Sequence, residues 1–250
     1  MWRVLFGSIL PVSLLGAWEW ASRSGTLTLD SLSRPSDILL AGYHGIRDGS
    51  ILLATGQTFE TAMLGLALAA VTGILCGATL GLSPILDRVT SPTVEALRAI
   101  PAVAFMPLAL MMFGFGVGLE ASIVAYACVW PILIVTVSAV RSVEPRLMEV
   151  ADALELSFRD RMMKVILPAT LARINVGLRV AAGIALVVAV TVEIVLNPRG
   201  LGYALILAQQ SLKTDVMYAQ LVWLCILGAA LNVVLRSLGG GQLVLWRPAQ

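Results

Sequence analysis

Residues 141–175 read RSVEPRLMEVADALELSFRDRMMKVILPATLARIN, and this stretch holds 11 of the 32 charged side chains in a chain of 250 residues. Its first half places apolar residues at i, i+3, i+4 and i+7, the spacing of one helix face: Leu147, Val150, Ala151 and Leu154. Acidic residues occupy the other faces. The pattern therefore predicts an amphipathic helix.

The second half of the stretch predicts another short helix. Ser157 stands three residues before Asp160, the spacing of an N-terminal capping box, and Pro168 is expected to end the helix because proline cannot continue its hydrogen bonding. Two short helices joined by a turn would form a protruding hairpin. Its basic residues would suit anionic lipid, but the acidic first half favours insertion into a groove on a partner protein.

Outside this stretch the chain is strongly apolar. Charged residues make up 13% of the sequence, hydrophobic residues 58%, and the mean hydropathy is +0.91. A soluble domain needs about a quarter of its residues charged. The composition therefore excludes a cytosolic enzyme, a nucleic-acid-binding protein and a disordered chain, and indicates a protein of the lipid bilayer.

The positions of the charges predict six membrane spans in an all-α membrane protein. A spanning helix needs about 20 mostly apolar residues. The candidate stretches are Val4–Trp18, Thr61–Leu86, Ala99–Leu119, Ala121–Val140, Val180–Pro198 and Val216–Leu235. The first could instead be a signal peptide, but Glu19 and Ala21 do not form a small-residue cleavage pair, which favours a retained helix.

The predicted organisation has three parts. Residues 1–55 hold the first span and an outer amphipathic segment, residues 56–240 form a core of five spans that includes the loop 141–175, and residues 241–250 form a cytoplasmic tail. With the N-terminus inside, 12 Lys and Arg residues lie on the cytoplasmic side and five on the other. The positive-inside rule then predicts a multi-pass plasma membrane protein with both termini in the cytoplasm.

The second span carries a small residue at every fourth position. These residues are Gly65, Ala69, Gly73, Gly77 and Gly81. Such a stripe lets two helix backbones approach closely in lipid. It predicts helix packing, within one subunit in preference to a seam between two copies.

Five residues are candidates for a translocation pathway or gate. Pro101 and Pro107 would bend the third span, which needs a wet cavity or neighbouring groups to satisfy the freed carbonyls. Glu193 is the only acid of the fifth span and must face protein or water. Gly200 and Gly202 belong to a cluster of helix-breaking residues that predicts a re-entrant or interfacial turn. No metal-ligand cluster is predicted.

The residues of the loop resemble the signature of binding-protein-dependent ABC importer permeases. Glu149-Val150-Ala151, then Glu155, then Val165-Ile166-Leu167-Pro168 keep the spacing of that motif. Further segments resemble the nitrate, sulfonate and taurine branch of the family: Leu97–Pro101, Pro107-Leu108, Phe113–Gly116, Trp130-Pro131, Gly177–Arg179, Glu193 and Gly200–Tyr203. The resemblance covers roughly residues 55–240 and implies a type I ABC importer fold.

The chain departs from the family motif at three positions. Val150 and Val165 replace other small or apolar residues, and Glu155 occupies the glycine position. In such permeases the glycine makes the turn between the two coupling helices. A residue with a Cβ atom resists left-handed dihedrals, so the turn is expected to differ in shape.

The resemblance implies a transport subunit and not an enzyme. It implies a homodimer whose loops dock on two copies of an ATP-binding subunit, where ATP and Mg would bind, with a periplasmic or lipid-anchored solute-binding protein delivering a small solute such as nitrate, a sulfonate or taurine. No cofactor is expected on this chain. The implied coupling residues are Glu149, Ala151, Asp152, Ala153, Leu154, Glu155, Leu156, Ser157 and Pro168.

The residues themselves leave an alternative open. The chain has no phosphate-binding loop of the Gly-x-x-x-x-Gly-Lys type, so its energy must come from a partner or from an ion gradient. The alternative is therefore a self-sufficient ion-coupled transporter or channel, although such proteins usually carry several ionisable groups at mid-membrane.

Overall fold

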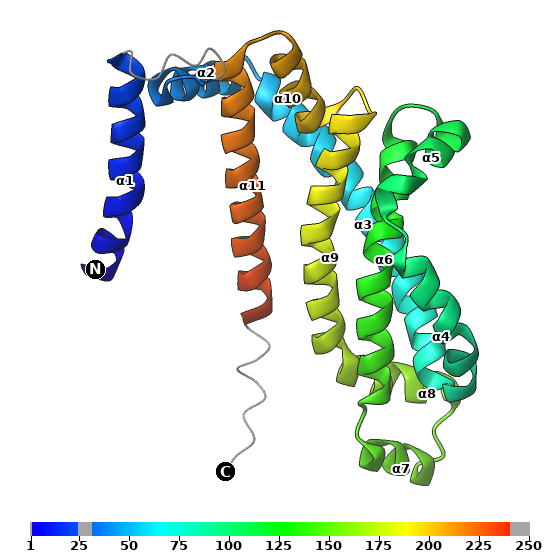
Figure 1. The fold of residues 1–250 in the computed structure, drawn as a ribbon. Coiled ribbons are helices and arrows are strands. Elements are labelled where there is room, and N and C mark those ends of the chain that lie inside the picture. The colour runs from blue at the N-terminus through cyan, green and yellow to red at the C-terminus, as the bar shows by residue number, and fades with distance from the viewer. Residues whose placement is uncertain (1, 25–31, 241–250) are drawn as a thin grey trace.

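A computed structural model describes residues 2–24 and 32–240, and every regular element in that part of the chain is helical (Figure 1). The predicted tail 241–250 lies outside the described residues. The elements are α1 (Trp2–Arg23), α2 (Pro35–Arg47), α3 (Ser50–Leu82), α4 (Pro84–Ala99), η1 (Ala102–Phe105), α5 (Met106–Phe113), α6 (Val117–Arg141), α7 (Pro145–Ala153), α8 (Phe158–Arg161), η2 (Met162–Ile166), α9 (Leu167–Val195), α10 (Gly200–Gln210) and α11 (Thr214–Gly240).

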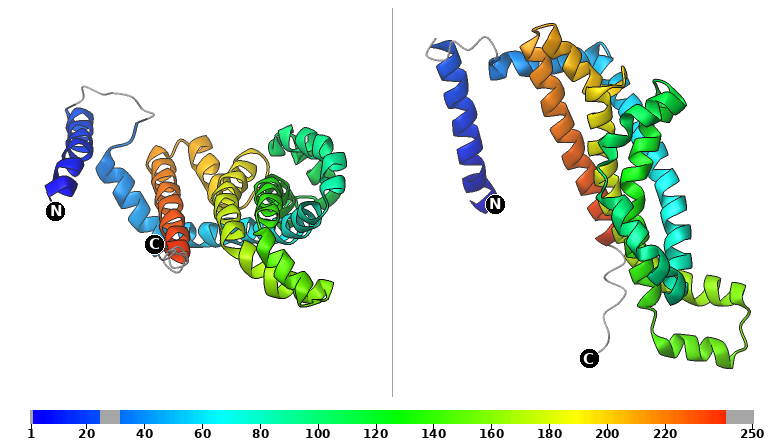
Figure 2. Two further views of the ribbon diagram at one scale, coloured as in Figure 1. Left: turned by 90° about the horizontal axis from the view of Figure 1, so that it is seen from below. Right: turned by 45° about the vertical axis from the view of Figure 1, so that its right-hand side comes forward.

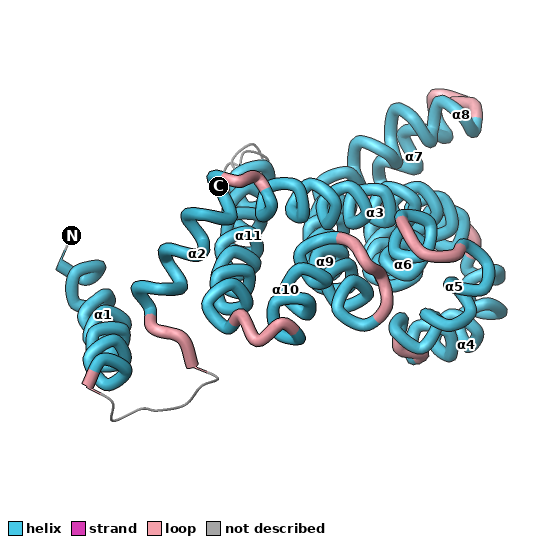
Figure 3. The backbone as a smooth tube through the Cα atoms, turned by 90° about the horizontal axis from the view of Figure 1, so that it is seen from above, coloured by secondary structure: helices cyan, strands magenta, loops and turns pink. Residues whose placement is uncertain are grey.

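Helices α3, α6 and α9 form the centre of the molecule. Viewed from above, α4 and α5 lie on one side of this centre, and α11 and α1 lie on the other (Figure 3). The hairpin of α7 and α8 projects from one end of the bundle, while α2 and α10 lie at the opposite end (Figures 1 and 2).

The most extensive helix contact joins α3 to α6. The glycine stripe of α3 faces α6 within the same chain: a Cβ atom on Gly77 would lie 2.8 Å from the carbonyl oxygen of Leu133, and one on Gly73 would lie 3.1 Å from that of Val129. Gly65 and Gly81 meet Val124 and Val140 in the same way. Because the glycines have no side chain, the two backbones come into direct contact.

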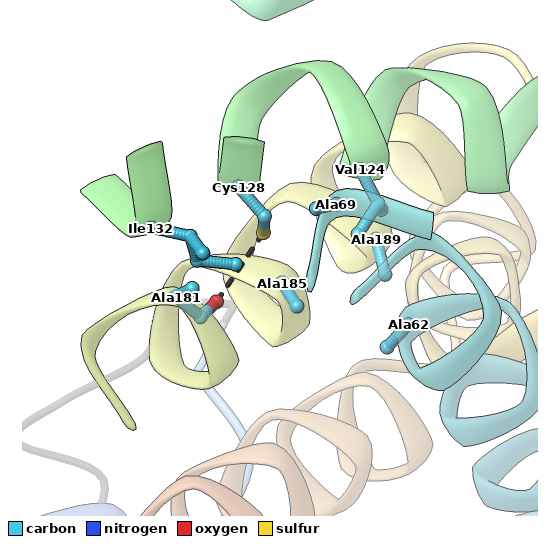
Figure 4. Packing of buried hydrophobic residues seen from close by; sticks show 8 residues of the cluster. All are labelled: Ala62, Ala69, Val124, Cys128, Ile132, Ala181, Ala185 and Ala189. Carbon is cyan, nitrogen blue, oxygen red and sulfur yellow. Dashed lines mark hydrogen bonds between the residues drawn. The ribbon is translucent and has the colours of Figure 1, made fainter. Parts of the chain in front are cut away.

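Small side chains also fill the junction of α3, α6 and α9. This core consists of Ala62, Ala69, Val124, Cys128, Ile132, Ala181, Ala185 and Ala189 (Figure 4). The thiol of Cys128 donates a weak hydrogen bond to the carbonyl oxygen of Ala181 at 3.3 Å. Alanine and glycine thus hold three helices at close range, where van der Waals contact replaces the hydrophobic drive that lipid cannot supply.

Four helical stretches in the described part of the chain are long and apolar enough to cross a membrane. They are Ser50–Leu82, Val117–Arg141, Phe158–Gln210 and Thr214–Leu235, and the bent pair Pro84–Ala99 and Ala102–Phe113 would make a fifth. Helix α1 covers the first predicted span but is not among them. The structure therefore supports fewer than the six predicted spans by this measure.

Proline bends the third predicted span, Ala99–Leu119, as expected, but the prediction of a single bent helix was wrong. The chain bends by 84° between α4 and the segment that follows, with Pro101 at the break and Pro107 in the first turn of α5. Gly114 and Gly116 then take positive φ angles of 67° and 123° and end α5 before α6 begins. Proline and glycine together stop the helix here, because proline lacks an amide donor and glycine accepts φ values that other residues avoid.

The prediction that Pro168 ends the second hairpin helix was also wrong. Helical structure continues from α8 through the π-helical turn η2 into α9, where Pro168 lies in the first turn. A π turn absorbs one residue that does not fit the 3.6-residue repeat. The helix can therefore pass the proline, and the projecting hairpin comprises only residues 145–166.

We expect Gly77→Val to destabilise the bundle, because the new side chain would collide with the backbone of α6. Overpacking of this kind costs about 1–3 kcal/mol. Thermal unfolding of the detergent-purified protein should show the loss. Gly56→Val is the matched control on the same helix, since a Cβ atom there has no neighbour within 4 Å; equal effects of the two variants would contradict the packing role of the stripe.

Candidate functional site

In the hairpin of residues 145–166, a tight turn follows α7 and leads to α8. The Leu156 amide donates to the Ala151 carbonyl at 3.0 Å, and the Glu155 amide donates to the Asp152 carbonyl at 2.9 Å. These two bonds form a Schellman motif, in which the residue at the Glu155 position is left-handed and usually glycine. Glu155 has φ 47°. The expectation of a differently shaped turn was therefore wrong: glutamate adopts the left-handed conformation, at a cost of roughly 1–2 kcal/mol.

Polar side chains fix the second half of the hairpin. The Asp160 amide donates to the Ser157 hydroxyl oxygen at 3.2 Å, which confirms the predicted cap, and the Ser157 hydroxyl donates to the Asp160 carboxylate at 2.7 Å. Lys164 pairs with Asp160 at 2.7 Å. Hydrogen bonds from Lys164 and Ser157 hold the pKa of Asp160 below its usual range. An ion pair between Arg161 and Asp152 ties α8 back to α7.

The outer face of the hairpin presents large apolar side chains. Phe158 is 73% exposed, and Leu154 and Val150 are also exposed. A small groove of about 290 Å³ lies beside them, lined by Leu154, Leu156 and Pro168 among others. Exposed apolar residues that cluster on a charged hairpin are typical of a contact surface for another protein.

The structure brings the predicted coupling residues into this one region. Eight of them lie on α7 and the turn that follows: Glu149, Ala151, Asp152, Ala153, Leu154, Glu155, Leu156 and Ser157. Pro168 lies on α9 but lines the same groove. Ala151 is buried, whereas Glu149 points into solvent.

A second polar cluster lies at the opposite end of the bundle, where α10 begins. Each of the first three amides of α10 donates to a side chain of another element: Gly200 to Gln57 at 2.9 Å, Leu201 to Thr58 at 3.0 Å and Gly202 to Glu193 at 2.8 Å. These amides have no acceptor within the helix itself. Side chains of α3 and α9 therefore take the place of water at a buried helix terminus.

At both candidate glycines, Gly200 and Gly202, neighbouring atoms leave no room for a side chain. A Cβ atom on Gly200 would collide with the Glu193 carboxylate, and one on Gly202 would lie 2.5 Å from the Val190 carbonyl oxygen. Gly200 also has φ 82°. The structure thus buries Glu193, Gly200 and Gly202 together at the α9–α10 junction, while Pro101 and Pro107 lie apart from them at the α4–α5 break.

Glu120 extends the polar cluster behind Glu193. Its carboxylate accepts hydrogen bonds from the Thr61 hydroxyl and, at 2.7 Å, from the side-chain Nδ2 of Asn197. The side-chain Oδ1 of Asn197 accepts from the Gly116 backbone amide at 2.9 Å. Glu120 is 1% exposed and Asn197 0%. Glu193 is likewise buried, at 2% exposed, so that two acids lie in this cluster.

Sequence reasoning missed Glu120, Asn197 and their threonine partners. In the sequence, Glu120 stands between two apolar runs, and no local pattern assigns it a partner. In the structure, the Asn197 side chain joins the two segments: it donates to Glu120 and accepts from the Gly116 amide.

A cleft of about 530 Å³ with both apolar and charged lining residues opens between α4 and α6, near the hairpin end of the bundle. Its walls carry Asp87, Glu95, Arg98 and Arg141, and Asp87 pairs with Arg141 at 2.8 Å. No residue of α4 is buried. This face of the chain is therefore both charged and uncovered.

We expect Glu193→Leu to leave the Gly202 amide without an acceptor, at a cost of about 1–3 kcal/mol. Glu193→Gln should retain most of the stability, because its side-chain carbonyl still offers an acceptor to the Gly202 amide. Thermal unfolding and amide exchange at the start of α10 would measure both. Glu60→Gln, which removes only a surface ion pair with Arg199, is the control; a Gln variant as unstable as the Leu variant would contradict this account.

Comparison with known proteins gives a consistent picture. Residues 69–240 match the family described as binding-protein-dependent transport system inner membrane component. The chain is 29% identical to the putative aliphatic sulfonates transport permease protein SsuC of Bacillus subtilis, covering 96% of this chain and 87% of that protein. It is 30% identical to the taurine transport system permease protein TauC of Escherichia coli, covering 90% and 84%.

A solved structure shares the fold. An inward-facing form of the MetNI methionine ABC transporter aligns with a TM-score of 0.62 over 76% of this chain and 93% of that chain, at 19% identity. The family model covers more than half of the present chain, including the glycine stripe from Ala69 onward, the hairpin and the α10 cluster. The chain belongs to the family of inner membrane components of binding-protein-dependent transport systems.

Proposed function

We propose that the chain is the permease subunit of an ATP-driven importer, and that it forms the translocation pathway for a small anion such as a sulfonate, taurine or nitrate. The observation that carries this proposal is the hairpin of residues 145–166, which exposes the apolar side chains of Val150, Leu154 and Phe158 and whose two halves are joined by the ion pair between Arg161 and Asp152. The membership in the transport family and the names of the relatives support the substrate class.

The hairpin is the proposed joint with a cytoplasmic ATP-binding subunit, two copies of which would bind ATP and Mg. A helix-in-groove contact uses apolar anchors, which Val150 of α7, Leu154 at its end and Phe158 at the start of α8 offer. The hairpin end is then the cytoplasmic end, and both termini point to the cytoplasm. The α10 end faces the solute-binding protein outside the bacterial or archaeal plasma membrane.

The proposed pathway runs along the face of α4 and α6. Charged side chains of α4 cannot face lipid without a cost of at least about 2.5 kcal/mol each at the bilayer centre. Asp87, Glu95 and Arg98 therefore require water or protein opposite them. A second copy of the chain would cover this face and enclose a polar passage, in which Arg98 could attract an anion; Pro101 and Pro107 place the bend of the wall beside it.

The buried acids have a structural role in this scheme. Neither carboxyl group lines the cleft between α4 and α6. At the α10 junction, Glu193 accepts from the Gly202 amide, and Glu120 accepts from Thr61 and from the Asn197 side chain. We therefore assign Glu193, Gly200 and Gly202 to holding the outer end of the pathway in shape.

We expect the purified chain, reconstituted alone in liposomes, to transport no sulfonate or taurine, because it has no means of coupling to ATP. Co-reconstitution with its ATP-binding subunit and solute-binding protein should give ATP-dependent uptake of labelled substrate. Uptake by the chain alone, driven by a proton or sodium gradient, would show instead that it is a secondary transporter.

We expect Phe158→Ala to weaken the complex with the ATP-binding subunit. A central aromatic anchor contributes about 2 kcal/mol or more to such interfaces, equivalent to roughly 30-fold in affinity. Co-purification and titration of the ATP-binding subunit would measure the change. Met111→Ala, at an exposed apolar residue of α5 away from the hairpin, is the control; unchanged binding by the Phe158 variant would place the joint elsewhere.

A further inference from the structure

A lateral groove of about 410 Å³ lies between α3, α9 and α11 on the side of the bundle away from α4. Its walls are mostly apolar and include Met63, Ala67 and Ala70 of α3 and Leu235 of α11. Its polar lining side chains are Arg179 and Asn175, one turn apart on α9. Among the described residues that line it, the groove thus combines an apolar wall with one cationic group, Arg179.

Arg179 has no acidic partner in the described part of the chain. The ion pairs found there involve other residues, and Asn175 is neutral. An arginine within a membrane-spanning helix is costly unless its charge is paired or reaches the membrane surface. The Arg179 guanidinium therefore has to reach an anion or water outside the described part of the chain.

Arg179 lies in the half of α9 that is nearer the hairpin end. It lies between Gly177, which contacts Val135 of α6, and Ala181, which contacts Cys128. These two levels are about 9 and 20 Å from the end of α6 at Arg141. Helical side chains lean toward the N-terminus of their helix, which for α9 is the hairpin end. The guanidinium therefore reaches toward the headgroups at the hairpin end.

We propose that this groove binds one anionic glycerophospholipid of the leaflet at the hairpin end, with its phosphate on Arg179 and Asn175. One acyl chain lies along α3 between Met63 and Ala70. A groove with an apolar wall and one cation at its end is complementary to a lipid that has a long apolar chain and an anionic head. The leaflet is the inner one if the orientation given under the proposed function holds, and the binding itself does not depend on transport.

The test uses the full chain purified in mild detergent and native mass spectrometry with dioleoyl phosphatidylglycerol as the probe. The wild type should retain one phosphatidylglycerol per chain and much less dioleoyl phosphatidylcholine. Arg179→Gln should lower the retained lipid at least tenfold. Arg173→Gln, at an exposed arginine earlier on α9 that does not line the groove, should not change it.

A second variant tests the apolar wall without altering charge. Ala67→Phe, at an exposed position, should fill the groove and also displace the lipid, which keeps the proposal testable if Arg179→Gln folds poorly. Equal retention by the wild type and both groove variants, or equal losses for the variants of Arg179 and Arg173, would overturn it. So would disulfide crosslinking of Ala67→Cys between two copies in the membrane, because the groove would then be covered by protein. Lipid retention needs no ATP-binding subunit, so this result is separable from failure of the transport assay.

Discussion

The direct backbone contact between α3 and α6 is the constraint on which the rest of the structure depends. In lipid, two apolar helices gain nothing by hiding from water, so they associate only where their surfaces fit closely. Four glycines on one face of α3 provide that fit against α6. Helix α9 then packs on both through alanines, and α2, α4, α5, α10 and α11 contact one or more of these three.

At both ends of the central bundle of α3, α6 and α9, the chain includes non-helical segments. Non-helical backbone at membrane depth is tolerated only where protein or water satisfies its polar groups. At the α10 end, the amides of Gly116, Gly200 and Gly202 all find side-chain acceptors. At the hairpin end, the Schellman turn at Glu155 and the cap at Ser157 satisfy the exposed helix termini. The apolar ridge of the hairpin and the charged face of α4 are left without partners in the chain, and both are surfaces where an importer would meet other subunits.

Local patterns in the sequence predicted the elements whose cause is local. The amphipathic spacing before Leu154 and the Ser157 cap depend on residues within one or two turns, and both appear where expected. The break of the third span was only partly foreseen, because Pro101 predicted a bend but not that Gly114 and Gly116 would end the helix. The prediction that a helix ends at Pro168 failed because the π turn before this proline has no recognisable sequence pattern.

The sequence by itself determined that this is a helical membrane protein with a charged hairpin, since the free energy of burying charge in lipid acts on each residue independently of its neighbours. Only the tertiary structure decided which helices touch, that Glu120 and Glu193 lie buried side by side, and that Glu155 takes a left-handed conformation. Those outcomes depend on contacts between residues such as Asn197 and Glu120, which are 77 positions apart. Such contacts exist only once the glycine face of α3 has brought the helices together.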